Sequence, residues 1–136
     1  GTPEEIYNDP ANVFVAQFIG TPKMNILEVN EENVVSENTI KLLGNDIKFN
    51  NLQLKKSKHF VGIRPEHLKA IQDTKFTFNP EIELIENLGN EKIIYLKKDK
   101  NQLSAKIPSN AEIKNTIGFD LQDLLIFDKN KNRIRS

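Results

Sequence analysis

The chain has 136 residues, enough for one ordinary domain or for one domain with a short addition. Hydrophobic residues make up 38% of it and charged residues 28%, so a buried core is expected and wholesale disorder is not. Its 19 basic residues equal its 19 acidic residues, which argues against nucleic acid or anionic lipid as a partner, and the absence of cysteine excludes disulfides and thiolate metal sites.

The first twenty residues predict two short helices. Each helix is expected to begin with a capping residue followed by proline, at Thr2–Pro3 and at Asp9–Pro10, and the second helix is expected to end at Gly20. Because this second helix is apolar on nearly all sides, it must be buried on the following domain, on a partner or on sequence outside the chain. The expected docking side chains are Val13, Phe14, Phe18 and Ile19.

From Met24 onward the pattern changes to short strands. "MNILEVN" is the first, and "TIKLL" and "DIKFN" predict a hairpin whose two turn residues are Gly44 and Asn45. "LQL" at 52–54 continues the alternation. The side chains expected to face inward in the hairpin are Ile40, Leu42, Ile47 and Phe49.

The second half of the chain continues as strands. "HFVGI" is stopped by Pro65, "EIELIENLG" and "EKIIYLK" are joined across Gly89–Asn90, and "QLSAKIP" alternates cleanly. "TIGFDL", "DLLIFD" and "RIRS" follow. The pattern predicts a mainly β chain, a small sandwich or closed barrel after a boundary near Gly20, with no span long enough for a membrane and no signal peptide. We therefore expect a soluble chain.

The stretch "HFVGIRPEHL" holds both histidines, His59 and His67, and raises the question of a metal or acid–base site. Two histidines on either side of a strand are too few ligands for zinc. The simpler interpretation is a strand that ends in a tight turn, with Arg64 paired to a carboxylate and Glu66 or His67 capping backbone groups.

No catalytic constellation stands out. There is no nucleophile elbow and no phosphate-binding loop, and alternation places Glu81 and Glu83 on the solvent face of a strand. The basic run "KKSKH" at 55–59 lacks the aromatic partners that single-stranded nucleic acid needs, so a solvated loop is the better interpretation. The sequence predicts no metal, cofactor or catalytic residue in this chain.

One irregularity points to a contact residue. In "EIELIENLG" Ile82 and Leu84 alternate inward, but Ile85 breaks the rhythm and Glu86 would then face the core. Because a buried unpaired carboxylate is unfavourable, we expect a bulge near Ile85 that turns Glu86 outward or toward a partner. The alternative is that Glu86 pairs with a lysine.

Four motifs in order resemble one family. "GTPEEIYNDPANVFVAQFIGTPKMNIL", "VGIRPEHL", "ENLGNE" and "LLIFDKNKNRI" are similar to the C-terminal part of ATP-binding-cassette (ABC) import ATPases of the carbohydrate-uptake type, such as the maltose, multiple-sugar and glycerol-3-phosphate importers. "KNKN" stands where that family usually has a glycine turn. The resemblance implies that residues 1–20 are the helical end of the ATPase domain and that 21–136 form a regulatory, transport-associated domain with an oligonucleotide/oligosaccharide-binding (OB)-like barrel.

The resemblance also implies a function. The domain would modulate the ATPase through protein contacts, with a second ATPase subunit, permease subunits and a regulatory protein as partners, on the cytoplasmic side of the membrane. ATP and Mg²⁺ would bind in an N-terminal domain outside this chain, so the chain itself would be no enzyme. By motif, the contact surface would include Ile26, Gly62, Glu86, Gly89, Asn90 and Glu91, beside a structural turn formed by Arg64, Pro65, Glu66 and His67.

Two other classes remain open at this stage. The barrel could be a sensor that binds a sugar or an oxyanion, although the lack of tryptophan argues against sugar stacking. A single-strand nucleic-acid binder would be retained on an oligonucleotide column in a salt-sensitive way.

Overall fold

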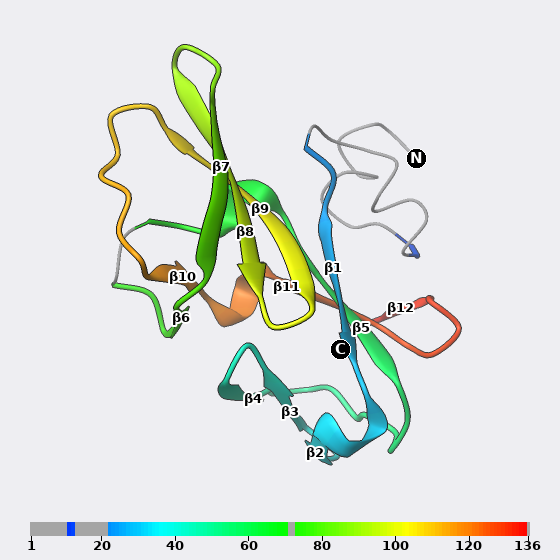
Figure 1. Cartoon of the computed structure of the whole chain (residues 1–136). Coiled ribbons are helices and arrows are strands. Elements are labelled where there is room, and N and C mark those ends of the chain that lie inside the picture. Colours follow the sequence, from blue (N-terminus) through cyan, green and yellow to red (C-terminus); the bar gives the residue numbers. More distant parts are fainter. Residues whose placement is uncertain (1–10, 13–21, 71–72, 136) are drawn as a thin grey trace. The chain divides into compact units, whose positions relative to one another are not determined.

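A computed structural model describes residues 11–12, 22–70 and 73–135. The chain divides into two compact units, residues 1–63 with 124–136, and residues 64–123. Short antiparallel strands dominate both units (Figure 1). No helix among the described residues is long and apolar enough to cross a membrane.

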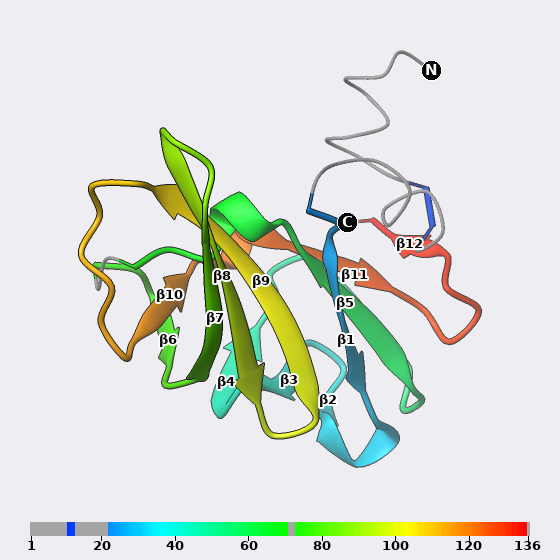
Figure 2. The same ribbon diagram turned by 45° about the horizontal axis from the view of Figure 1, so that its top comes forward.

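A four-stranded antiparallel sheet forms the body of the first unit. Its strands, in spatial order, are β1 (Asn25–Val29), β5 (His59–Ile63), β11 (Leu124–Phe127) and β12 (Arg133–Ile134). Figure 2 shows β1, β5 and β11 side by side. β5 is buried along its whole length, as a central strand between two neighbours is expected to be.

A smaller sheet in the same unit has the order β2 (Val34–Ser36), β3 (Thr39–Leu42) and β4 (Asn45–Lys48), preceded by a 3₁₀ turn, η1 (Glu31–Asn33). The predicted hairpin is present, but its two turn residues are Leu43 and Gly44, one position earlier than expected. Both have positive φ, 52° and 80°, as the favoured two-residue hairpin turn requires. The Leu43 side chain is buried, at 7% exposed, although Leu43 is one of the two turn residues.

The second unit is built on a three-stranded meander. β7 (Glu81–Asn87), β8 (Glu91–Lys98) and β9 (Asn101–Pro108) lie in that order, with β7 at one edge. β6 (Phe76–Phe78) pairs with β10 (Ile117–Phe119), and two 3₁₀ turns, η2 (Pro65–His67) and η3 (Leu121–Asp123), complete the unit. The alternation predicted for "QLSAKIP" is confirmed in β9, where Leu103, Ala105 and Ile107 are all buried.

The bulge predicted in β7 exists, but it lies nearer the start of the strand. The register shifts between Ile82 and Leu84, so Glu83 is the extra residue. After the shift Ile85 stands opposite Ile94, which is fully buried, and Leu84 is 60% exposed. The prediction that Leu84 faces inward is therefore wrong. After the early bulge Ile85, and not Leu84, stands opposite the buried Ile94, although Ile85 is itself 42% exposed.

Three further expectations need correction or lie outside the described residues. The described strands form four open sheets and no closed barrel, and residues 52–54 form no strand. The second predicted helix does not form at Asn12, which instead makes an isolated β-bridge with Asn132. The rest of both N-terminal helices, including Val13, Phe14, Phe18 and Ile19, lies outside the described residues.

Candidate protein-contact surface

The β7–β8 hairpin is the most exposed part of the described structure. Every residue from 83 to 91 is exposed, and the turn between the strands is closed by a hydrogen bond from the Leu88 N–H to the Glu91 carbonyl at 2.8 Å. The predicted turn residues Gly89 and Asn90 lie at its tip, and Gly89 has a φ of 91°, a conformation that glycine adopts without strain.

Large apolar side chains gather on this hairpin. Four exposed large hydrophobic residues occur among the described residues, and three of them are here: Leu84 (60% exposed), Ile85 (42%) and Leu88 (54%). Exposed apolar groups this close together commonly mark an interaction site. We call Leu84, Ile85, Glu86 and Leu88 the hairpin surface.

Glu86 lies within the hairpin surface and is exposed, as predicted. It stands opposite Ile93, which in turn stands opposite Lys106 of β9. The Lys106 ammonium is 3.5 Å from the Glu91 carboxylate, and no ion pair joins Glu86 to any described residue. The lysine partner that was the alternative for Glu86 is thus not found within the described part of the chain.

Ile26 and Gly62 are direct neighbours in the first unit. Ile26 of β1 stands opposite Gly62 of β5, and Leu125 of β11 stands opposite Gly62 on the other side. Ile26 and Leu125 are partly buried and pack on a cluster of Met24, Phe60 and Phe127. A Cβ on Gly62 would clash with the Met24 Sδ and lie 3.2 Å from the Phe127 Cε2, so glycine here permits close packing of side chains over the sheet.

The "RPEH" segment is the 3₁₀ turn η2, with Pro65 at its first position. Backbone hydrogen bonds hold it, from His67 N–H to the Arg64 carbonyl (2.9 Å) and from Leu68 N–H to the Pro65 carbonyl (3.2 Å), and no side chain caps its start. Arg64 is 4% exposed, and burial lowers the pKa of its guanidinium. The His67 Nδ1 is 3.8 Å from an Asp123 carboxylate oxygen, and Glu66 is exposed.

Two sets of predicted contact residues therefore fall in different units. Ile26 and Gly62 come together in the first unit, and Glu86, Gly89, Asn90 and Glu91 come together in the second. Sequence reasoning missed Leu84 and Leu88 as exposed residues. The run "LIENL", with apolar residues at positions that strict alternation cannot bury together, was the available signal.

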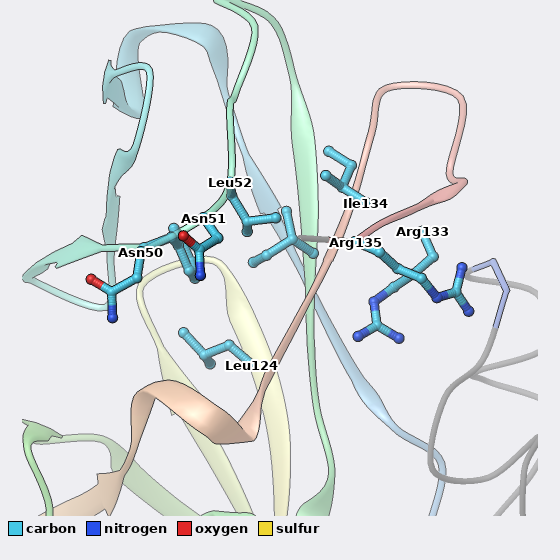
Figure 3. A pocket seen from close by; sticks show the side chains of 9 residues that line it. Asn50, Asn51, Leu52, Leu124, Arg133, Ile134 and Arg135 are labelled. Carbon is cyan, nitrogen blue, oxygen red and sulfur yellow. The ribbon is translucent and has the colours of Figure 1, made fainter.

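A cavity of about 410 Å³ lies in the first unit (Figure 3). Asn50 and Asn51 line one side of it, and Arg133 and Arg135 line another. Figure 3 shows both arginine side chains directed away from the two amides. The polar groups therefore do not converge on one point, as those of a specific ligand site do.

Curated import proteins match nearly the whole chain. The chain is 34% identical to the sn-glycerol-3-phosphate import ATP-binding protein UgpC of Psychromonas ingrahamii over 98% of its length, which is 38% of that protein. It is 39% identical to the maltose/maltodextrin import ATP-binding protein MalK of Vibrio parahaemolyticus over 71% of the chain and 27% of that protein. It is 30% identical to the alpha-glucoside transport ATP-binding protein AglK of Rhizobium meliloti over 100% of the chain and 40% of that protein.

The chain belongs to the ABC importer ATP-binding subunits. This confirms the family to which the four motifs pointed. The chain spans well under half the length of these ABC importer ATP-binding subunits, and no protein-family model matches it.

Proposed function

We propose that this chain is the regulatory part of the ATP-hydrolysing subunit of an ABC importer for sugars or related solutes. Residues 21–136 correspond to the regulatory, OB-like domain and residues 1–20 to the end of the ATPase domain. The names of the relatives give sn-glycerol-3-phosphate, maltose/maltodextrin and alpha-glucoside as the transported solutes, and these names support this class of solute. The chain changes ATPase output by making or releasing a protein contact.

ATP and Mg²⁺ bind outside this chain in this proposal. The sequence has no GxxxxGK[ST] loop, which is the device that cradles nucleotide phosphates in such ATPases. Permease subunits hold the whole assembly at the cytoplasmic side of the membrane. A second ATPase subunit and a regulatory protein are the partners that touch this part.

The hairpin surface is the observation that carries the proposal. It offers three exposed apolar side chains and a glutamate without an ion pair in the described structure, at the edge of a sheet. Its apolar centre can be self-complementary, as a two-fold contact between identical subunits requires. The charge at its rim contributes specificity more than affinity.

Sedimentation-velocity experiments test this contact. The unmodified chain is expected to dimerise. The Leu84→Ser/Leu88→Ser variant is expected to dimerise at least about tenfold more weakly, because truncating central apolar side chains at an interface weakens binding by about 1 kcal/mol or more each.

Val35→Ser is the matched control. Val35 is 54% exposed, like Leu88, but it lies on β2 in the other unit. Dimerisation that Val35→Ser weakens as much as the hairpin variant does, or an unmodified chain that stays monomeric at all concentrations, would refute the proposed contact.

A further inference from the structure

A second cavity lies in the first unit besides the one in Figure 3, and Ile134 lines both. Its volume is about 430 Å³, and it lies where β5 begins, between the loop at 53–57 and the turn at 128–130. Cavities of roughly 300–1,000 Å³ are the size that holds small molecules. Its lining residues are Gln53, Lys55, Lys56, Ser57, His59, Asp128, Lys129, Asn130 and Ile134.

Positive charge dominates this lining. It contains the three lysines Lys55, Lys56 and Lys129 and a single acid, Asp128, which leaves a net charge of +2 with His59 neutral, in a chain whose total is zero. The Lys56 ammonium donates to the Val34 carbonyl at 2.6 Å, which fixes its position.

The one acid is held within its own turn. The Asp128 Oδ1 accepts hydrogen bonds from the backbone N–H groups of Asn130 and Asn132, both at 2.9 Å. These bonds shape the turn that carries Lys129, and they use an acceptor that could otherwise bind a lysine ammonium. The Asp128 carboxylate keeps its negative charge in these bonds, so the three lysines leave the lining with a net charge of +2.

The polar groups of the opposite wall are also ordered. The His59 Nδ1 lies 2.9 Å from the Ser57 carbonyl, and because a carbonyl only accepts, this nitrogen carries the hydrogen. His59 is 2% exposed, so the start of β5 is firmly fixed beside the loop. The Ser57 hydroxyl and the Asn130 and Gln53 amides supply further donors.

Two more lysines lie at the same end of β5. The ammonium groups of Lys58 and Lys131 lie 5.3 Å and 5.5 Å from the centre of the Phe60 ring. Lys131 has a φ of 66°, a conformation that favours glycine, so the turn places a lysine where a side chain is strained. The Lys58 ammonium is also 3.3 Å from the Glu28 carboxylate, which offsets its charge, so only Lys131 adds to the positive potential at this end of β5.

We propose that this lysine-lined cavity binds a small solute that carries a phosphate group. Lysine ammoniums are compact charges that suit a phosphate dianion, and Ile134 offers an apolar surface for the uncharged remainder of the solute. The cavity is too small for a bilayer surface, and its lining has no phenylalanine, tyrosine or tryptophan on which a nucleic acid base could stack. The site is separate from the hairpin surface and does not depend on it.

An NMR titration of the chain with inorganic phosphate, and then with glucose 6-phosphate, tests the site. We expect saturable shifts of the Ser57 and Asn130 amides with both probes and none with glucose. The Lys55→Gln/Lys129→Gln variant should weaken binding about tenfold or more, because hydrogen bonds to charged groups contribute strongly to affinity.

The matched control is Lys97→Gln/Lys100→Gln, which removes two exposed lysines from the other unit and should leave binding unchanged. Shifts that never saturate, or an equal loss in both variants, would show general charge screening and overturn the proposal. Sedimentation of the chain with phosphatidylglycerol vesicles, without saturable binding of either soluble probe, would assign the lysines to a lipid headgroup and would also overturn it.

Discussion

At the scale of single residues, the glycine in "VGIRPEHL" has a packing role that its motif does not reveal. Gly62 is buried at the centre of β5, and the Met24 side chain lies directly over it. A substitution at Gly62 would therefore act first on the packing of Met24, Ile26 and Phe127. The same motif's arginine, Arg64, is buried as well.

Gly62→Ala should lower the free energy of unfolding by about 1–3 kcal/mol, because the added methyl group overpacks this face of the sheet. Urea denaturation measures the change. In a Met24→Ala background the cost of Gly62→Ala should shrink, since the clashing side chain is gone. An equal cost in both backgrounds would show that Met24 does not limit the space.

At the level of single residues, the exposure of Glu86 could be predicted because one physical rule decides it. A carboxylate without a partner stays in solvent, and Glu86 is exposed. The exposure of Leu84 was missed because a bulge can lie at several places in a strand with equal sequence support. Only the pairing of Ile85 with the buried Ile94 selects Glu83 as the extra residue.

At the scale of elements, the last strand joins two distant parts of the sequence. β12 pairs with β11 on one side, and on its other side the Arg133 N–H donates to the Ala11 carbonyl at 2.8 Å. The bridge between Asn12 and Asn132 continues this pairing. The segment at residues 11–12 is thus tied to the final hairpin through its backbone.

Hydrogen exchange at Arg133 tests this link. Its amide should exchange slowly in the full chain and about tenfold faster or more once residues 1–12 are removed, because it then loses its acceptor. The Asp128 amide, which donates to the Asn132 carbonyl at 2.8 Å in the same turn, is the internal control. Faster exchange at both amides would indicate that the whole hairpin had opened.

The strongly alternating elements were predictable and the weak ones were not. The stretch "HFVGI" coincides with β5, and the stretch "QLSAKIP" lies within β9. Both were predictable because their apolar residues either alternate or follow one another closely. β2 and β6, three residues each, were missed, since a short strand is decided by its partner more than by its own sequence. The bridge at Asn12 depends on Asn132, 120 residues later, and no local pattern encodes it.

At the scale of the whole molecule, a net charge of zero conceals a local basic cluster. Lys55, Lys56 and Lys129 line one cavity of the first unit together with a single acid, Asp128. The four glutamates of the β7–β8 hairpin are nearly balanced by its three lysines, Lys92, Lys97 and Lys98. Composition reports only the sum, so it could not predict the basic cavity, which follows from the loops that the strand pairing brings together.

The central claim is that this chain acts by a protein contact made through its β7–β8 hairpin. Because the chain has no cysteine, Asn90→Cys gives one site for a spin label at the hairpin tip. In a mixture with unlabelled, ¹⁵N-enriched chain, the label should broaden the amide signals of Leu84 to Leu88 in the other copy. Broadening confined to other segments, or no broadening between copies at any concentration, would contradict the account.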